Sequence, residues 1–233
     1  LISSNWGGTP AEIWTPEEVI ENNPVLIEAA KTRKEESYGP NQPGRAFNAM
    51  IYPLIHFKIA GVIWYQGESN VGSEVYDQTL SALITSWRKL WKSDFPFYYV
   101  QIAPYQYGEN HFGGAEVRDF QRRTLQLPKT GMVVTSDISP TDDIHPKDKK
   151  SVGVRLANLA LANTYKTNTA TVNGPLYKGI SIEKNKITVT FDYADGLFFK
   201  DKKADLFEVA GADNIFYTAN AVIKSNTVVL QSD

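Results

Sequence analysis

The sequence contains no cysteine, and it has no apolar run long enough to cross a membrane as a helix. The absence of cysteine excludes a disulfide scaffold, a thiol nucleophile and a cysteine-based zinc site. Basic residues form no cluster, and the formal net charge is −2. We therefore expect no nucleic-acid partner and no association with an anionic membrane surface.

Histidine is also scarce. The three histidines, His56, His111 and His145, are far apart, and no His-x-x-x-His pair is present, so we expect no metal site. His111 lies in a loop rich in Tyr, Gly and Asn and is a candidate substrate contact. The sequence also lacks a Gly-x-Ser-x-Gly motif, which disfavours an α/β-hydrolase.

What remains is an ordinary globular composition of 233 residues, 42% apolar and 21% charged. Apolar periodicity predicts strands at 1–5, 59–65, 95–102 and 131–136, and helices at 17–36, 75–91, 115–127 and 146–163. The first of these helices is expected to be interrupted by Asn22-Asn23-Pro24. Their alternation favours a parallel sheet with helices on both faces, in a domain of residues 1–167. The short alternating runs after this point predict an antiparallel β domain over residues 168–233.

Residues 60–70 form the most informative stretch. An apolar run stops at Gln66-Gly67-Glu68-Ser69-Asn70, which places a carboxylate, a hydroxyl and two amides at the end of a strand. In open α/β sheets, ligands bind at this carboxyl edge. A simpler interpretation of the Glu68 carboxylate is a partner for the dipole of the following helix.

A second polar segment, from Asp142 to Pro146, lies between the last expected strand and helix of the first domain. Its His145 is a candidate general base, because imidazole can accept and return a proton near neutral pH. A nearby carboxylate would orient the ring. A surface histidine beside a capping aspartate would give the same pattern.

These two segments resemble the sialate O-acetylesterase branch of the SGNH hydrolases, a wider group that includes acetylxylan esterases. The resemblance spans residues 1 to 233 and also rests on Trp6-Gly7-Gly8-Thr9, Asn48-Ala49-Met50-Ile51 and Val133-Val134-Thr135-Ser136-Asp137. It implies a flavodoxin-like, three-layer α/β/α sandwich followed by an antiparallel β domain.

In this family the nucleophilic serine belongs to a Gly-Gln-Ser-Asn type motif that precedes the Trp-Gly-Gly-Thr segment. Residues 1–233 contain no such motif before Trp6. The resemblance therefore implies a sandwich that is incomplete at its N-terminus, a β domain that is also incomplete, and a missing N-terminal segment as the partner of this one. We expect residues 1–233 alone to be inactive.

The resemblance makes His145 the general base. Many SGNH hydrolases use the Asp three residues before the histidine as the triad acid, which is Asp142 here, whereas acetylxylan-esterase relatives use the position of Glu68. We favour Glu68 slightly, and Asp143 would serve only in a differently shaped loop. Ser69 is an alternative nucleophile, because the order Ser…Asp…His would then be complete within the chain.

The resemblance also implies that Gly7 and Gly8 contribute to an oxyanion hole, since glycine lets a backbone N–H approach closely. Gln66 and Asn70 are candidates for a further donor. Arg118 lies on one face of an expected helix, together with Gln121, and is a candidate substrate contact in the cleft.

These features predict a carbohydrate O-acetylesterase that acts on sialic acid or on a plant polysaccharide such as xylan. The expected route is a serine acyl-enzyme that needs no cofactor. Resemblance implies a secreted or periplasmic protein. The alternative is a non-catalytic carbohydrate-binding protein, or an inactive fragment, on the same scaffold.

Overall fold

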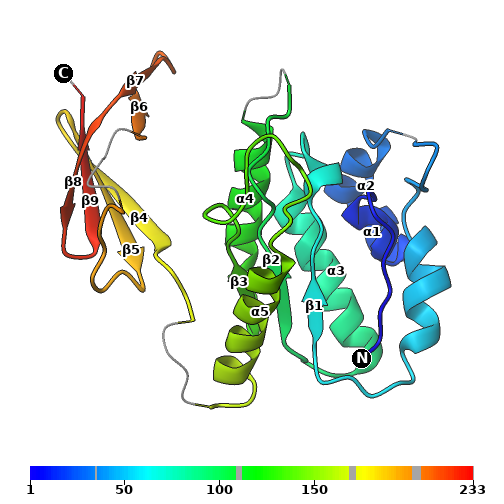
Figure 1. The fold of residues 1–233 in the computed structure, drawn as a ribbon. Helices are drawn as coiled ribbons and strands as arrows, with labels where there is room; N and C mark the ends of the chain where they lie inside the picture. Colours follow the sequence, from blue (N-terminus) through cyan, green and yellow to red (C-terminus); the bar gives the residue numbers. More distant parts are fainter. Residues whose placement is uncertain (35, 109–111, 168–171, 201–205, 233) are drawn as a thin grey trace. The chain divides into compact units, whose positions relative to one another are not determined.

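The computed structural model describes residues 1–34, 36–108, 112–167, 172–200 and 206–232 (Figure 1). The chain divides into two compact units, Leu1–Thr169 and Ala170–Asp233. Within the described residues, no helix combines the length and the apolar character needed to cross a membrane.

The first unit is built on a parallel sheet, as expected. Its strands are β1 (Val62–Trp64), β2 (Phe97–Val100) and β3 (Thr130–Val133), and β2 lies in the middle. The helices that follow the three strands are α3 (Tyr76–Trp91), α4 (Gly113–Thr124) and α5 (Lys149–Asn163). Each strand is shorter than the apolar segment that predicts it, because the pairing with the neighbouring strand ends before the apolar segment does.

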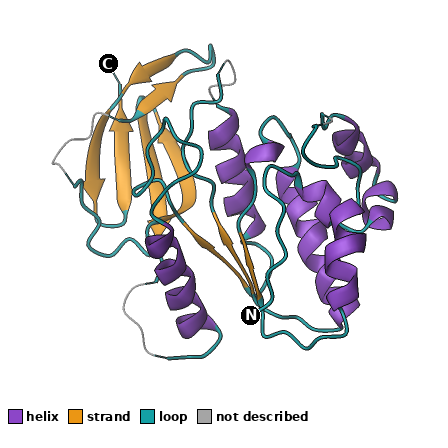
Figure 2. Ribbon diagram, turned by 45° about the vertical axis from the view of Figure 1, so that its right-hand side comes forward, coloured by secondary structure: helices purple, strands orange, loops and turns teal. Residues whose placement is uncertain are grey.

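Helices cover both faces of this sheet (Figure 2). Successive side chains of a strand point to opposite faces. Phe97 belongs to the core that α3 supplies, and the Tyr99 hydroxyl donates to the Gln121 carbonyl of α4 at 2.8 Å. Between them, the Tyr98 hydroxyl shares a 2.8 Å hydrogen bond with Thr164, just after α5. The expected three-layer α/β/α architecture is therefore confirmed.

The strand expected at residues 1–5 is wrong. This segment forms no strand and is largely exposed, because no described strand pairs with it. The helix expected at 17–36 has its expected interruption at Asn22-Asn23-Pro24, which separates α1 (Glu17–Glu21) from α2 (Pro24–Lys31). The Asn23 side chain caps α2 by accepting from the Val25 and Leu26 N–H groups, and Pro24 suits its first turn.

Short helical turns complete the first unit. They are η1 (Ala11–Trp14), η2 (Phe47–Ile51), η3 (Tyr52–Leu54) and η4 (Glu68–Asn70). Helix α5 begins at Lys149 and not at Pro146, because Asp148 is its cap and accepts from the Ser151 N–H at 2.9 Å. Residues 142–147 therefore remain a loop.

The second unit is an antiparallel β structure, as expected. Its main sheet has the order β4-β5-β9-β8, and β6 and β7 form a separate pair. Ala219, Val228 and Leu230 form its buried core. The strands are β4 (Leu176–Glu183), β5 (Lys186–Asp192), β6 (Glu208–Ala210), β7 (Phe216–Thr218), β8 (Asn220–Lys224) and β9 (Thr227–Gln231).

Candidate active site

A cavity of about 1480 Å³ in the first unit collects residues that follow the carboxyl ends of two strands. We call it the edge cavity. One wall follows β1, a second follows β3, and a third precedes η1. Five of the predicted site residues line it, namely Gly7, Gly8, Gln66, Glu68 and His145.

Gly67 explains the sharp turn that places Gln66 and Glu68 on the cavity wall. Its φ of 155° lies where L-residues are rarely found. A Cβ at this position would lie 2.6 Å from the Ile102 Cγ2 atom. Only glycine fits this turn without displacing its neighbours.

Gln121 of α4 fastens the same turn to the sheet. Its amide nitrogen donates to the Gln66 carbonyl at 3.2 Å and to the Val100 carbonyl at 3.1 Å, and its amide oxygen accepts from the Ile102 N–H at 2.9 Å. The side chain is fully buried. Gln121 therefore holds the turn after β1 against the end of β2. It is outside the described lining of the edge cavity, although its place on the helix beside Arg118 also suits a cleft residue.

The two candidate amide donors are occupied inside the protein. The Gln66 amide nitrogen donates to the Thr9 carbonyl at 3.1 Å and to the Asn70 Oδ1 atom at 2.7 Å. The Asn70 amide nitrogen donates to both carboxylate oxygens of Glu12, at 3.1 and 2.9 Å. An amide nitrogen has two N–H groups, so each side chain is fully used. This arrangement does not favour either as an oxyanion donor.

Glu68 is half-buried, and its carboxylate shares the cavity with two potential cations. Burial raises the pKa of Glu68, while the nearby charges of Lys149 and His145 act in the opposite direction. The Lys149 ammonium lies 4.8 Å from the centre of the Tyr65 ring. Burial, together with the Glu68 charge, raises the pKa of Tyr65 to about 12. Glu68, His145 and Lys149 are thus the ionisable groups of the site, and Tyr65 adds a neutral phenol.

His145 is exposed in the loop that precedes α5, where its imidazole lines the cavity. Its backbone N–H donates to the Asp143 Oδ1 atom at 2.8 Å, so Asp143 shapes the loop. Asp142 is exposed and does not belong to the described cavity lining. Of the candidate acids, Glu68 is the one that shares the cavity with His145.

Arg118 lies elsewhere on α4. Its guanidinium is close to Tyr107, and burial lowers its pKa. Its carbonyl accepts from the Gln101 side chain at 2.9 Å. The residue is outside the described lining of the edge cavity, so its role as a substrate contact remains a prediction.

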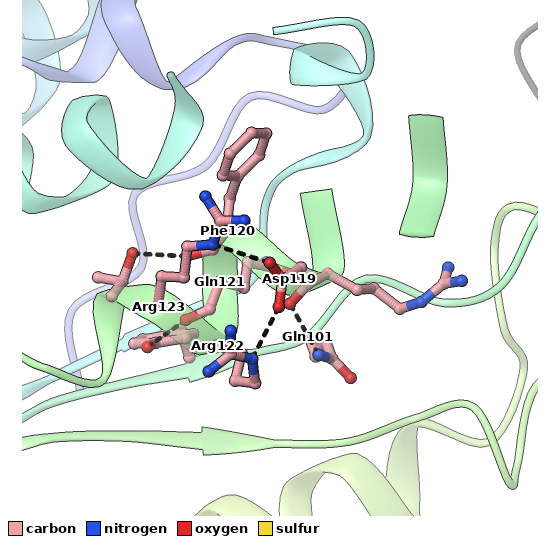
Figure 3. Close-up of polar contacts among 9 residues, drawn as sticks. Gln101, Asp119, Phe120, Gln121, Arg122 and Arg123 are labelled. Carbon is pink, nitrogen blue, oxygen red and sulfur yellow. Dashed lines mark hydrogen bonds and ion pairs between the residues drawn. The ribbon is translucent and has the colours of Figure 1, made fainter. Parts of the chain in front are cut away.

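The neighbouring charges on α4 have a different role. Arg122 and Arg123 both direct a guanidinium N–H to the carboxylate of Asp119, at 2.7 and 2.8 Å (Figure 3). They therefore form a local ion-pair network on the helix. Partly exposed pairs of this kind contribute little to stability.

Ser69 and His111 are the two remaining candidates. Ser69 lines the edge cavity together with His145, and its nucleophilic role stays an alternative. His111 lies outside the described residues. Within the described part of the chain, no group of three or more His, Cys, Asp or Glu side chains is arranged to hold a metal ion.

The arrangement has counterparts among known proteins. Residues 1–162 match the family described as carbohydrate esterase, sialic acid-specific acetylesterase. The chain is 31% identical to the sialate O-acetylesterases of Homo sapiens and Pongo abelii, over 90% of this chain and 44% of each relative. It therefore spans less than half the length of these relatives.

A solved structure is similar over nearly the whole chain. A carbohydrate acetylesterase from Xanthomonas citri matches 99% of this chain and 52% of its own, with a TM-score of 0.85 and 33% sequence identity. The family match and the fold agree with the resemblance carried by the Trp6–Thr9, Gln66–Asn70 and Asp143–Pro146 motifs. The chain belongs to the sialic acid-specific acetylesterase family of carbohydrate esterases.

Proposed function

We propose that the full-length protein hydrolyses O-acetyl esters on a carbohydrate through a serine acyl-enzyme, with His145 as the general base. The observation that carries this proposal is the meeting of His145 and Glu68 in one cavity, from loops that follow two different strands. Gly7 and Gly8 line the same cavity. A base, a carboxylate and glycine backbone at one place are the parts that acyl transfer requires in addition to the nucleophile.

In the proposed reaction, a serine oxygen attacks the acetyl carbonyl while the His145 imidazole accepts the serine proton. Backbone N–H groups of the Gly7–Gly8 segment stabilise the resulting oxyanion. The imidazolium then gives its proton to the departing sugar hydroxyl, and the acetyl group remains on the serine. Water, activated by His145, attacks the acyl-enzyme and releases acetate.

Glu68 is proposed to orient the imidazole and to stabilise its charged form. Its neighbourhood supports this role, because the His145 charge affects the pKa of Glu68. Asp142 is the alternative acid. The serine is proposed to belong to the Gly-Gln-Ser-Asn type motif of the family, which residues 1–233 lack, and Ser69 is the alternative nucleophile.

The substrate class is inferred from the relatives. Their names specify sialate and carbohydrate acetyl esters, so we propose an O-acetylated sialic acid as the first substrate to test. Acetylated xylan is the second, on the resemblance to acetylxylan esterases. The same resemblance is the basis for proposing a secreted or periplasmic location.

The test is acetate release by the full-length protein from O-acetylated sialic acid and from acetylated xylan. His145→Ala should lower kcat by roughly a thousandfold or more, as for other triad histidines. His56→Ala is the matched control, because His56 is exposed and lies outside the described lining. Near-normal turnover by His145→Ala would refute the proposed base.

Two more variants identify the acid and the nucleophile. Glu68→Gln should reduce kcat far more than Asp142→Asn, and the reverse order would assign the acid to Asp142. Ser69→Ala should retain activity if the serine lies in the family motif. Sugar binding without any acetate release by the wild-type protein would favour the carbohydrate-binding alternative.

A further inference from the structure

Glu12 is a buried acid that the proposed reaction does not use. It lies in η1, and its side chain is completely inaccessible to solvent. Burying a carboxylate is costly unless it is paired. Both of its oxygens accept hydrogen bonds from the Asn70 amide nitrogen, at 3.1 and 2.9 Å. The side chain that hydrogen-bonds to it among the described residues is thus a neutral one, in the Gln66–Asn70 turn. Burial raises the pKa of Glu12, while its own backbone N–H and the charge of Arg33 oppose this rise.

Asn70 connects this acid to two walls of the edge cavity. Its Oδ1 atom accepts from the Ala11 N–H at 2.9 Å and from the Gln66 amide nitrogen at 2.7 Å. Because the oxygen faces two donors, the Asn70 nitrogen must face Glu12. The Glu12 carboxylate accepts from the nitrogen end of the Asn70 amide and so holds its orientation together with the Ala11 N–H at the oxygen end.

The network continues beyond Asn70. Gln66 donates to the Thr9 carbonyl at 3.1 Å, and its amide oxygen accepts from the Tyr76 hydroxyl at 2.9 Å. Gln66 and Asn70 anchor the two ends of a turn whose centre contains Gly67 and Glu68. The other anchors, Thr9 and Ala11, lie one and three positions after Gly8.

We infer that Glu12 is a positioning residue for the reaction. Its carboxylate holds the Asn70 side chain, and Asn70 connects the turn that contains Glu68 with the segment that follows Gly8. The inference rests on the proposed function. A positioning error of about 1 Å in a catalytic group can cost a hundredfold in rate. A purely structural acid would affect stability and leave the rate of the folded enzyme unchanged.

An exchange of the two side chains separates these cases. Asn70→Asp sets two carboxylates face to face, so kcat should fall about a hundredfold or more. Adding Glu12→Gln puts an amide N–H donor opposite the new carboxylate, so the two side chains can again form a hydrogen bond. Asp at position 70 can still accept from Ala11 and Gln66. The kcat of the double variant E12Q/N70D should therefore be at least tenfold higher than the kcat of Asn70→Asp alone.

The single variant Glu12→Gln tests the acid itself. A glutamine can accept only one of the two Asn70 N–H groups and presents its own donor to the other, so kcat should fall about ten- to hundredfold. KM should change less than threefold. Ser86→Ala is the control, because it also removes a buried hydrogen bond, to the Leu83 carbonyl, but on α3.

Each measurement is made on the full-length protein. Acetate release gives kcat and KM, thermal unfolding gives Tm, and hydrogen exchange follows the amides of residues 66–71. In Glu12→Gln these amides should exchange at least tenfold faster, whereas Ser86→Ala should leave them unchanged. If the wild-type protein releases no acetate, the proposed function is refuted, whereas unchanged exchange in Glu12→Gln refutes the claim that Glu12 holds the turn, so the two failures are distinguishable.

Two results would overturn the inference. One is a Glu12→Gln variant with a lower Tm but with unchanged kcat in the folded protein and unchanged exchange at residues 66–71. The other is a double variant that is no more active than Asn70→Asp, because the complementary pair would then not be what sets the rate.

Discussion

Replacing Gly67 by alanine tests how tightly the turn at the edge cavity is built. The new Cβ would lie 2.6 Å from the Ile102 Cγ2 atom, whereas carbon atoms in contact prefer about 3.5–4.0 Å. It would also lie 3.3 Å from the Gln121 amide nitrogen. Ile102 and Gln121 are both fully buried, so neither can move aside into solvent.

The expected cost has two parts. Holding an L-residue at the φ of Gly67 costs about 1–3 kcal/mol. Crowding the packed site costs about 1–3 kcal/mol more. Gly67→Ala should therefore lower the free energy of unfolding by roughly 2–6 kcal/mol. If the turn moves instead, Glu68 moves with it, and kcat falls.

Urea unfolding and acetate release by the full-length protein measure the two outcomes. Gly108→Ala is the control, because Gly108 has a φ of 61° and a Cβ there meets nothing within 4 Å. It should lose only the backbone contribution, about 1–2 kcal/mol. If Gly67→Ala costs no more than Gly108→Ala and leaves kcat unchanged, the close approach to Ile102 does not constrain the turn.

Three further predictions concern buried charge. Lys149→Met should raise the pKa of Glu68 further, because the Lys149 charge opposes the effect of burial; carbon-13 NMR titration of the carboxyl would show it, and an unchanged midpoint would contradict it. Burial raises the folded-state pKa of Glu12 above its ordinary 4.5, so the folded protein holds the extra proton and wild-type stability falls as pH rises above that value. Glu12→Gln removes this dependence, and a pH-independent difference in unfolding free energy between the two proteins would refute it. Arg88→Met should cost about 2–4 kcal/mol, because the buried guanidinium donates to the Phe95 and Lys129 carbonyls at 3.0 and 3.2 Å; a loss in urea unfolding below 1 kcal/mol would mean that solvent replaces both bonds.

The sequence predicts the framework of the first unit well, because its helices and strands bury long apolar stripes. The stripe along 75–91 gives α3 to within one residue, and the run at 95–102 contains β2. The apolar start of the chain was misleading for a physical reason. Leu1 and Ile2 have strand propensity, but a strand also needs a neighbour, and the described structure leaves both residues exposed.

The site is predicted in part. Ligand binding at the carboxyl edge of an α/β sheet is a general property of the fold, and this rule predicts that Glu68 and His145 lie at the same edge. The direction of a side-chain amide has no such rule. Asn70 and Gln66 were interpreted as donors to a ligand, yet their N–H groups point into the protein.

Glu12 shows why the remainder of the network was missed. Its partner Asn70 is 58 positions away, and a glutamate at a helical turn is normally solvated. The available signal was its context, because Glu12 is set between Ala11 and the apolar pair Ile13-Trp14, just after the glycine motif. An acidic residue inside a short apolar run, beside a functional motif, is a signal that its side chain is buried and bonded to another buried polar side chain.

The three amides at this edge share one physical task. Gln66, Asn70 and Gln121 each donate and accept, so each can join two segments that no sheet or helix connects. An ionised carboxylate can only accept, and a hydroxyl has a single O–H to donate, so neither could make the two donated bonds that each of these amides makes. Since their N–H groups are used inside the protein, the proposed reaction relies on the nucleophilic serine, the Glu68 carboxylate, the His145 imidazole and backbone N–H groups. The polar residues of the motif thus divide into the two amides that hold the turn, Gln66 and Asn70, and the two residues that line the cavity with free functional roles to test, Glu68 and Ser69.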